Sequence, residues 1–180
     1  MRLKLTLLVI VLAMLSTGRA QVLNSGISLK SDKFRLGLLP TVLSDNFGIF
    51  VQGGYGLRSD MDINFRIGAG YPDMYVGADL EFMILTRKPY FSVSAGAHYF
   101  GDVGLDASGT FTIPIDPQVH LYTGLDMDII FNEDKTNVPF WFRLGAEVAF
   151  KKNLSILLEA GLGINDPAYS IFSGGFNIYF

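Results

Sequence analysis

The sequence predicts an all-β fold, specifically an up-and-down antiparallel transmembrane β-barrel with ten strands. Three observations favour this fold. Polar and apolar residues alternate along segments of ten or more residues, the chain is rich in glycine and aromatic residues, and a long apolar run occurs only within residues 1–20. A strand that crosses a bilayer needs about 9–11 residues, whereas strands of soluble proteins usually have about 5–6. An eight-stranded barrel is the second interpretation.

Residues 1–20 have the pattern of a secretory signal peptide. Arg2 and Lys4 form a positive N-terminal region, residues 5–15 are almost entirely apolar, and residues 18–20 form a small-x-small cleavage site. The apolar run is shorter than the roughly 20 residues that a membrane-spanning helix needs, so a retained anchor is the weaker alternative. Cleavage removes three of the 14 basic residues and leaves 11 against 17 acidic residues, a formal charge of −6. This charge argues against nucleic acid as a partner.

Ten segments of the remaining chain alternate between apolar and polar residues with a period of two, and we expect each to be a strand. Residues typical of turns, such as Asp, Asn, Gly and Pro, separate them. The expected strands cover residues 33–42, 46–57, 60–71, 73–85, 89–100, 103–115, 118–131, 138–150, 153–164 and 168–180. In the ninth segment Leu154, Ile156 and Leu158 fall on one face, and Ser155 and Glu159 on the other. Many glycines lie inside the strands, where they relieve crowding or allow curvature.

The apolar faces are expected to contact lipid, and the polar faces to line a narrow interior. In hydrocarbon every backbone N–H and C=O must be hydrogen-bonded, and closure of the sheet removes unpaired edges. A soluble lipocalin-like barrel, with its apolar side chains inside, is the main structural competitor. Eleven charged residues are expected to face inward: Arg35, Asp62, Arg66, Asp79, Glu81, Asp106, Asp126, Asp128, Arg143, Glu147 and Glu159.

These inward charges predict a packed network, because a buried charge is costly unless it is paired and hydrogen-bonded. The expected pairs are Arg66 with Asp79, and Arg143 with Asp126 or Asp128 on one side and with Glu159 on the other. The alternative is a narrow water-filled channel. It would be biased toward cations, since eight acidic residues stand against three arginines.

The C-terminal strand ends in residues 173–180, Ser-Gly-Gly-Phe-Asn-Ile-Tyr-Phe. This ending resembles that of the small bacterial outer-membrane barrel proteins, the group that includes opacity-type and other eight- to ten-stranded barrels. Their last strand has the form polar-Gly-x-x-apolar-x-apolar and is read by the barrel assembly machinery. Gly175, Ile178 and Phe180 match this assembly signal, whereas Gly174 departs from the polar first position. The resemblance covers the signal peptide and the whole barrel, and implies a location in the bacterial outer membrane.

With the N-terminus in the periplasm, an even number of strands places both chain termini on the periplasmic side. Residues 21–32 are then expected to be a short periplasmic N-terminal lead-in to the barrel of residues 33–180. The longest connection, residues 132–137, is expected to be extracellular. The other external loops are short, which leaves little room for an adhesin or receptor function.

The predicted function is therefore that of an outer-membrane barrel with a structural or accessory role in the envelope, its interior filled by a polar charge network. A narrow cation-biased channel is the alternative. Expected partners are outer-membrane lipid and, during insertion, the barrel assembly machinery. A larger envelope protein complex is a further candidate partner.

A lipid-modifying enzyme or protease at the external rim is the least favoured class. His98 is expected to face inward near the outer end of its strand, close to Asp102 and Asp106, and a His–Asp pair could act as a general base. Ser108 is expected deeper in the barrel and His120 at the opposite end. A polar interior histidine without a catalytic role is the favoured interpretation. The sequence contains no cysteine, no metal-ligand cluster and no phosphate-binding loop, so no metal or cofactor is predicted.

Overall fold

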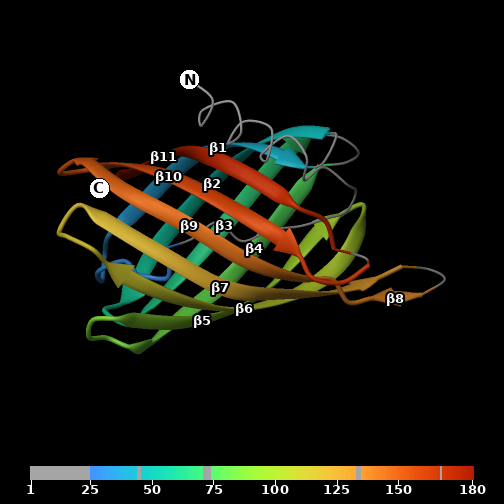
Figure 1. Ribbon diagram of the computed structural model, residues 1–180, viewed down its shortest axis with the longest axis horizontal. Coiled ribbons are helices and arrows are strands. Elements are labelled where there is room, and N and C mark those ends of the chain that lie inside the picture. The colour runs from blue at the N-terminus through green and yellow to red at the C-terminus, as the bar shows by residue number, and fades with distance from the viewer. Residues whose placement is uncertain (1–24, 44–45, 71–73, 133–134, 167) are drawn as a thin grey trace, which may run out of the picture.

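The computed structural model describes residues 25–43, 46–70, 74–132, 135–166 and 168–180 (Figure 1). The predicted signal peptide and the first residues of the lead-in lie outside the described residues. The strands are β1 (Phe34–Leu43), β2 (Asn46–Arg58), β3 (Met61–Gly70), β4 (Tyr75–Leu85), β5 (Tyr90–Phe100), β6 (Asp102–Pro114), β7 (Val119–Phe131), β8 (Thr136–Asn137), β9 (Phe140–Lys151), β10 (Leu154–Gly163) and β11 (Ile171–Tyr179). Across the described residues no helix is long and apolar enough to span a membrane.

Ten of these strands form one closed antiparallel sheet, and their bounds lie within three residues of the predicted ones. Each strand pairs with its neighbours in chain order, and β1 pairs with both β2 and β11, so the sheet has no free edge. The short β8 falls within the predicted loop and pairs with the end of β7, where Phe131 lies opposite Thr136. It extends that hairpin beyond the wall (Figure 1). The ten-stranded up-and-down barrel is confirmed, and the eight-stranded alternative is wrong.

The two ends of the barrel differ in what they carry. We call the end where β1 begins and β11 finishes the terminal end; it lies at the left in Figure 1. The opposite end, from which β8 projects, is the distal end. The even strand number would make the terminal end periplasmic.

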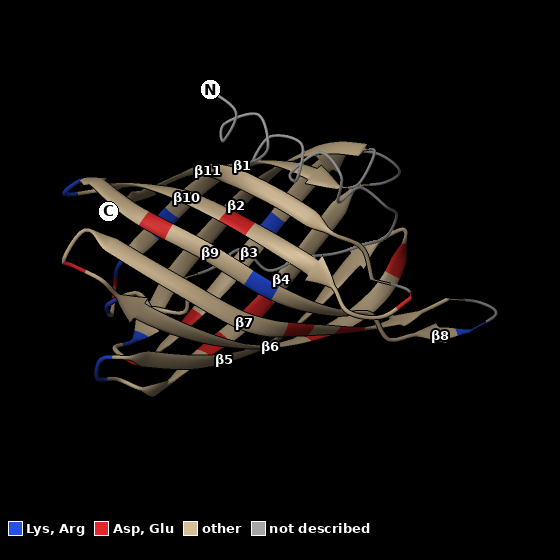
Figure 2. Ribbon diagram, viewed as in Figure 1, with Lys and Arg blue, Asp and Glu red and all other residues tan. Residues whose placement is uncertain are grey.

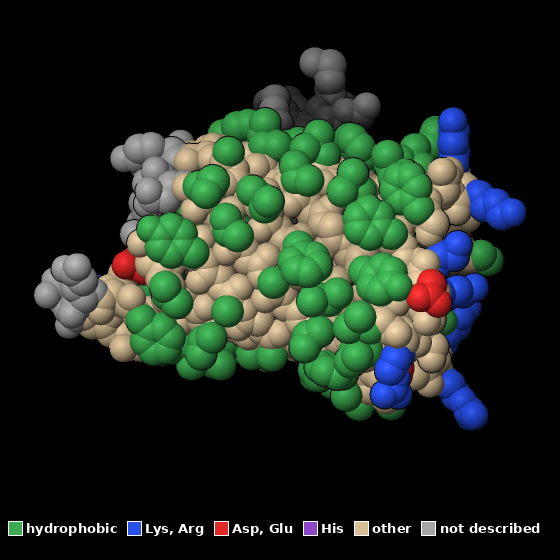
Figure 3. Space-filling view, turned by 180° about the vertical axis from the view of Figure 1, so that it is seen from behind, with side chains coloured by type: hydrophobic (Ala, Val, Ile, Leu, Met, Phe, Trp, Pro, Cys, Tyr) green, Lys and Arg blue, Asp and Glu red, His purple; other side chains and the backbone are tan. Residues whose placement is uncertain are grey.

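The outer surface of the barrel is an apolar belt (Figure 3). Phe65, Ile67 and Leu158 are apolar, yet 50%, 57% and 51% of their surfaces are exposed. On the inward faces, by contrast, Asp62 and Arg143 are both 0% exposed. Apolar side chains point outward and charged ones inward, as predicted for a membrane barrel and opposite to a lipocalin-like one.

Exposed aromatic side chains lie near both ends of the apolar belt. Phe34 and Phe150 are exposed at the terminal end, and Phe47, Tyr99 and Phe131 at the distal end. Aromatic girdles at the two membrane interfaces are typical of transmembrane barrels. The strands between these girdles are therefore the membrane-spanning part of the chain.

Candidate functional site

The barrel interior is the candidate site, because the polar and charged side chains gather there while the outside is apolar. Figure 2 shows Asp, Glu and Arg residues distributed along the middle of the strands. Three layers fill the interior from the distal to the terminal end. They are an apolar cluster, a charged layer, and a segment of chain that precedes β1.

Large apolar side chains close the distal part of the interior. The buried cluster contains Leu39, Leu43, Phe50, Tyr75, Phe100, Tyr122, Trp141, Leu157, Tyr169 and Ile171. The Tyr75 ring lies 5.5 Å from the Phe50 ring and 6.0 Å from the Phe100 ring, measured between centroids. Trp141 is 1% exposed, and its Nε1 donates to the carbonyl of Tyr169 at 2.7 Å. Trp141 and Leu157 stand among polar residues on the inward faces of β9 and β10, and the alternation did not predict this layer.

Three large inward rings each lie opposite a glycine on the neighbouring strand. The pairs are Phe50 with Gly68, His98 with Gly104, and Tyr122 with Gly145. A Cβ atom on any of these glycines would overlap the facing ring. The glycines therefore provide room for the rings, which is the crowding relief that the sequence predicted for glycines inside strands.

A chain of hydrogen bonds connects charged residues across β1, β3 and β4. Arg66 Nη2 lies 2.6 Å from Asp79 Oδ2, and these two side chains are 2% and 1% exposed. Asn64 Nδ2 donates to Asp62 Oδ1 at 3.0 Å and to Asp79 Oδ1 at 3.1 Å. Arg35 Nη2 donates to Asn64 Oδ1 at 2.7 Å. The structure thus brings Arg66 and Asp79 together as the register predicted, and adds an asparagine that the sequence analysis missed.

Arg143 is the centre of a second polar group on the opposite wall. Its Nη2 donates to Thr110 Oγ1 at 2.7 Å, and Tyr122 Oη donates to Glu159 Oε2 at 2.9 Å. The residues directly opposite Arg143 are Gly124 on β7 and Gly161 on β10. Asp126 and Glu159 therefore lie one inward position further along their strands. Both carboxylates remain within electrostatic range of the guanidinium. Diagonal neighbours in a sheet are within reach of a side chain as long as arginine.

His98 is enclosed between two carboxylates and an aromatic ring. Its Nδ1 lies 3.2 Å from Asp106 Oδ2, and its Nε2 lies 3.8 Å from Asp128 Oδ2. The Tyr75 ring stacks on the imidazole with a centroid distance of 5.6 Å. The His–Asp pair expected from the sequence therefore exists with Asp106, but the His98 side chain is only 2% exposed and lies against Tyr75 of the distal cluster.

The other residues of the enzyme hypothesis lie apart from His98. Asp102, at the distal rim, accepts a hydrogen bond from Asn132. The Ser108 hydroxyl is hydrogen-bonded to that of Ser94 at 2.7 Å. Within the described part of the chain, no group of three or more His, Cys, Asp or Glu residues is placed to hold a metal ion.

The terminal part of the interior is filled by residues 25–33, which we call the N-terminal segment. Ser25 and Leu29 are 3% and 6% exposed. The backbone N–H of Leu29 donates to Asp62 Oδ2 at 2.9 Å, and the Thr112 hydroxyl donates to the carbonyl of Ser25. The segment thus reaches from β3 to β6 inside the barrel.

Backbone hydrogen bonds fix the end of this segment to β2. Asp32 N donates to Gly56 O, and Gly56 N donates to Lys33 O, both at 2.9 Å. A Cβ atom at Gly56 would overlap the carbonyl of Lys30. The sequence predicts only a lead-in here. Gly56, a glycine at an inward position of β2, is the sequence signal that another backbone approaches this strand closely.

The remaining inward acids are paired with hydroxyl groups near the terminal end. Glu81 Oε1 accepts a hydrogen bond from Ser92 Oγ at 2.6 Å. Glu147 Oε1 accepts from Ser155 Oγ at 2.5 Å and from the Tyr179 hydroxyl. All eleven residues of the predicted interior set are buried, and their functional role stays a prediction.

The three residues of the predicted assembly signal lie on the strand that closes the barrel. A Cβ atom at Gly175 would overlap the carbonyl of Leu38 on β1, so this position requires glycine for strand pairing. Ile178 pairs with Leu36, and Phe180 N donates to the carbonyl of Phe34 at 2.9 Å. Recognition of these residues by the assembly machinery stays a prediction.

A closed ten-stranded sheet with an apolar outer belt, aromatic girdles and a polar interior defines a transmembrane β-barrel of the bacterial outer membrane. No protein-family model matches the chain, and no curated protein matches it.

Solved structures of the same class do match. The NanC porin is 6% identical with a TM-score of 0.55, and the match covers 81% of this chain and 98% of that one. The KdgM porin, solved with disordered oligogalacturonate, is 11% identical with a TM-score of 0.49 and coverages of 82% and 99%. Omp33 of Acinetobacter baumannii is 8% identical with a TM-score of 0.47 and coverages of 86% and 100%. At these identities the similarity concerns the fold alone, for which we rely on NanC.

Proposed function

We propose that this protein is a closed outer-membrane barrel with a structural or accessory role in the envelope. The observation that carries the proposal is the filled interior. Apolar rings occupy its distal part, hydrogen-bonded charges its centre, and the N-terminal segment its terminal part. Asp62 and Arg143, which would contact water in an open pore, are both 0% exposed.

Conductance in a planar bilayer tests this proposal directly. The wild-type protein is expected to give no discrete conductance, because three filled layers would block a continuous water path. Removing residues 25–32 alone is also expected to leave the barrel silent, since the distal cluster still closes it. Adding Phe50→Ala and Tyr75→Ala to that deletion leaves the charged layer open to water from both ends, so the triple change should produce channels. Regular unitary currents from the wild-type protein would contradict a closed barrel.

The second candidate is a narrow cation-biased channel. It is supported by eight acidic residues against three arginines inside, and by Asp106 Oδ1 and Asp128 Oδ2, which are buried without a hydrogen-bond partner. The NanC match, a porin, is consistent with it. This candidate predicts wild-type currents selective for K⁺ over Cl⁻ that fall when Asp126, Asp128 or Glu159 is neutralised.

An accessory role implies a protein partner in the envelope. We expect a defined partner to co-purify in a fixed ratio from native membranes in mild detergent. A clean monomer would count against this part of the proposal. An enzymatic role would instead require His98, and we expect His98→Ala to leave the lipid composition of the envelope unchanged.

A further inference from the structure

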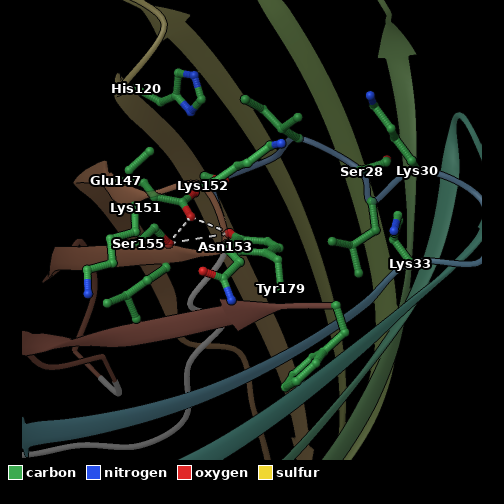
Figure 4. A pocket seen from close by; sticks show the side chains of 16 residues that line it. Ser28, Lys30, Lys33, His120, Glu147, Lys151, Lys152, Asn153, Ser155 and Tyr179 are labelled. Carbon is green, nitrogen blue, oxygen red and sulfur yellow. Dashed lines mark hydrogen bonds between the residues drawn. The ribbon is translucent and has the colours of Figure 1, made fainter.

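A cavity of about 540 Å³ opens at the terminal end (Figure 4). It lies between the N-terminal segment and the wall formed by β7, β9, β10 and β11. Cavities of about 300–1,000 Å³ are typical of sites for small molecules.

Four lysines surround the cavity, two from each side. Lys30 and Lys33 belong to the N-terminal segment, Lys151 is the last residue of β9, and Lys152 lies in the turn between β9 and β10. All four side chains are exposed. Figure 4 shows the two pairs on separate elements of the chain, with the cavity between them. Four ammonium groups around one opening favour a negatively charged ligand.

Glu147 is the acidic side chain among the lining residues, and it does not cancel this preference. Its carboxylate accepts hydrogen bonds from Ser155 Oγ and the Tyr179 hydroxyl, so those donors already stabilise its charge. Glu147 is also 6% exposed, whereas the lysines are at the open rim. An acidic ligand group at the rim would therefore meet lysines first.

Apolar side chains form another part of the lining. Ile27 and Leu29 come from the N-terminal segment, and Ala149 and Leu154 from the barrel wall. An alkyl group placed against them would lose contact with water, which is favourable by about 25 cal/mol for each Å² of apolar surface removed from water. A rim of lysines above an apolar lining suits a molecule with one charged and one apolar part.

We propose that this cavity binds a small amphipathic anion, with its phosphate or carboxylate group at the lysines and its alkyl part against Ile27, Leu29 and Leu154. The anion would touch both the N-terminal segment and the β9–β10 turn. It would therefore hold the segment in place. A phospholipid headgroup region and a soluble alkyl phosphate or carboxylate share this chemistry.

The cavity must be distinguished from the general positive charge of this end. Basic side chains gather at the terminal end, at the right in Figure 3. By the strand bounds, the basic residues of this end are Lys30, Lys33, Arg58, Arg87, Lys88, Lys151 and Lys152. Arg87 and Lys88 carry two positive charges at the same end but do not line the cavity. They provide a control matched in charge.

The test is calorimetric titration of hexyl phosphate into the full-length mature protein in phosphatidylcholine nanodiscs, with empty nanodiscs as the blank. Lys30→Gln/Lys152→Gln is expected to weaken binding about 25-fold, about fivefold for each lysine removed. Arg87→Gln/Lys88→Gln is expected to leave the affinity within about twofold. Binding of hexyl phosphate should exceed that of inorganic phosphate and of hexanol, because each of these lacks one half of the proposed ligand.

Three results would overturn the proposal: no saturable binding of hexyl phosphate, equal weakening by both double variants, or equal affinity for hexyl phosphate and inorganic phosphate. A repeat in nanodiscs that contain phosphatidylglycerol separates the two sources of the ligand. If phosphatidylglycerol weakens the binding of hexyl phosphate, the cavity is assigned to a bilayer lipid. If the affinity for hexyl phosphate is unchanged, the cavity is assigned to a soluble amphiphile. Both results support the site. Conductance is measured separately, so failure here leaves the closed barrel intact.

Discussion

The two ends of the barrel interior are closed by different means. At the distal end the wall closes itself, because Phe50, Tyr75 and Trp141 project inward from three different strands and are buried together. At the terminal end a separate piece of chain enters the opening. Polar contacts such as the bond from Leu29 N to Asp62 Oδ2 hold it there.

This difference implies that the two closures have different stabilities. Truncating a buried aromatic side chain typically costs about 3–5 kcal/mol. A single hydrogen bond contributes a net of only about 0.5–1.5 kcal/mol. We therefore expect the terminal closure to open more readily, and to open without unfolding of the barrel. The distal closure is part of the sheet and opens only when the wall rearranges.

The largest effect is expected from Phe50→Ala in the distal cluster. The substitution removes a ring that is 7% exposed and packs edge-on against Tyr75, so the barrel should lose about 3–5 kcal/mol of unfolding free energy. Denaturant unfolding in lipid vesicles measures the loss. Trp141, the single tryptophan, lies in the same cluster and reports on it by fluorescence.

Phe50→Leu is the matched control for this change, because it keeps much of the volume and is expected to cost less than about 1.5 kcal/mol. Protection of the N-terminal segment against trypsin should be unaffected by either variant. If Phe50→Ala accelerated trypsin cleavage of the N-terminal segment in proportion to its loss of unfolding free energy, the two closures would not be independent.

The contrast between the two ends also explains what the sequence could predict. Alternation with a period of two is a local pattern. It directly predicts the ten strands, which face of each strand points inward, and the interior position of Arg143 and Glu159. The contact between Ser25 and Thr112 joins positions 87 residues apart, and the N-terminal segment has no periodicity of its own. Its position depends on the shape of the finished interior, which no local pattern contains.

The distal cluster was missed for a related reason. Leu157 and Trp141 occupy inward positions among polar residues, so in the sequence they look like irregularities of the alternation rather than parts of one layer. Only closure of the sheet brings these positions together with Tyr169 and Leu39. The predicted pairing of Arg143 was also only approximate. Its carboxylate neighbours lie diagonally from it on the adjacent strands, and not directly opposite.

A smaller and more local effect is expected from Asp62→Ala at the terminal end. Without its carboxylate the backbone N–H of Leu29 loses its acceptor, which costs about 1–3 kcal/mol of docking free energy. Cleavage by trypsin after Lys30 or Lys33 should accelerate at least fivefold, because it follows the population of the open segment. Mass spectrometry locates the cut, and heat-modifiable gel migration shows that the barrel stays folded.

Asp60→Ala is the control for Asp62→Ala. Asp60 lies in the turn before β3 and pairs with Arg58 at the surface, 3.1 Å between Oδ1 and Nε, so its loss should leave cleavage unchanged. Equal acceleration in both variants would show that the acidic charge near this turn, rather than the bond to Leu29, keeps the segment in place.

A more local effect is expected from Gly26→Ala within the segment itself. Gly26 has a φ of +65°, a conformation that costs a residue with a side chain about 1 kcal/mol, and a Cβ atom would lie 2.8 Å from Ser92 Oγ. Trypsin cleavage should rise about fivefold while unfolding of the barrel stays the same.

Ser28→Ala offers the opposite test, because the Ser28 hydroxyl is buried without a hydrogen-bond partner. Its removal should leave docking equal or tighter, so faster cleavage of Ser28→Ala would mean that the segment is not held in the position described.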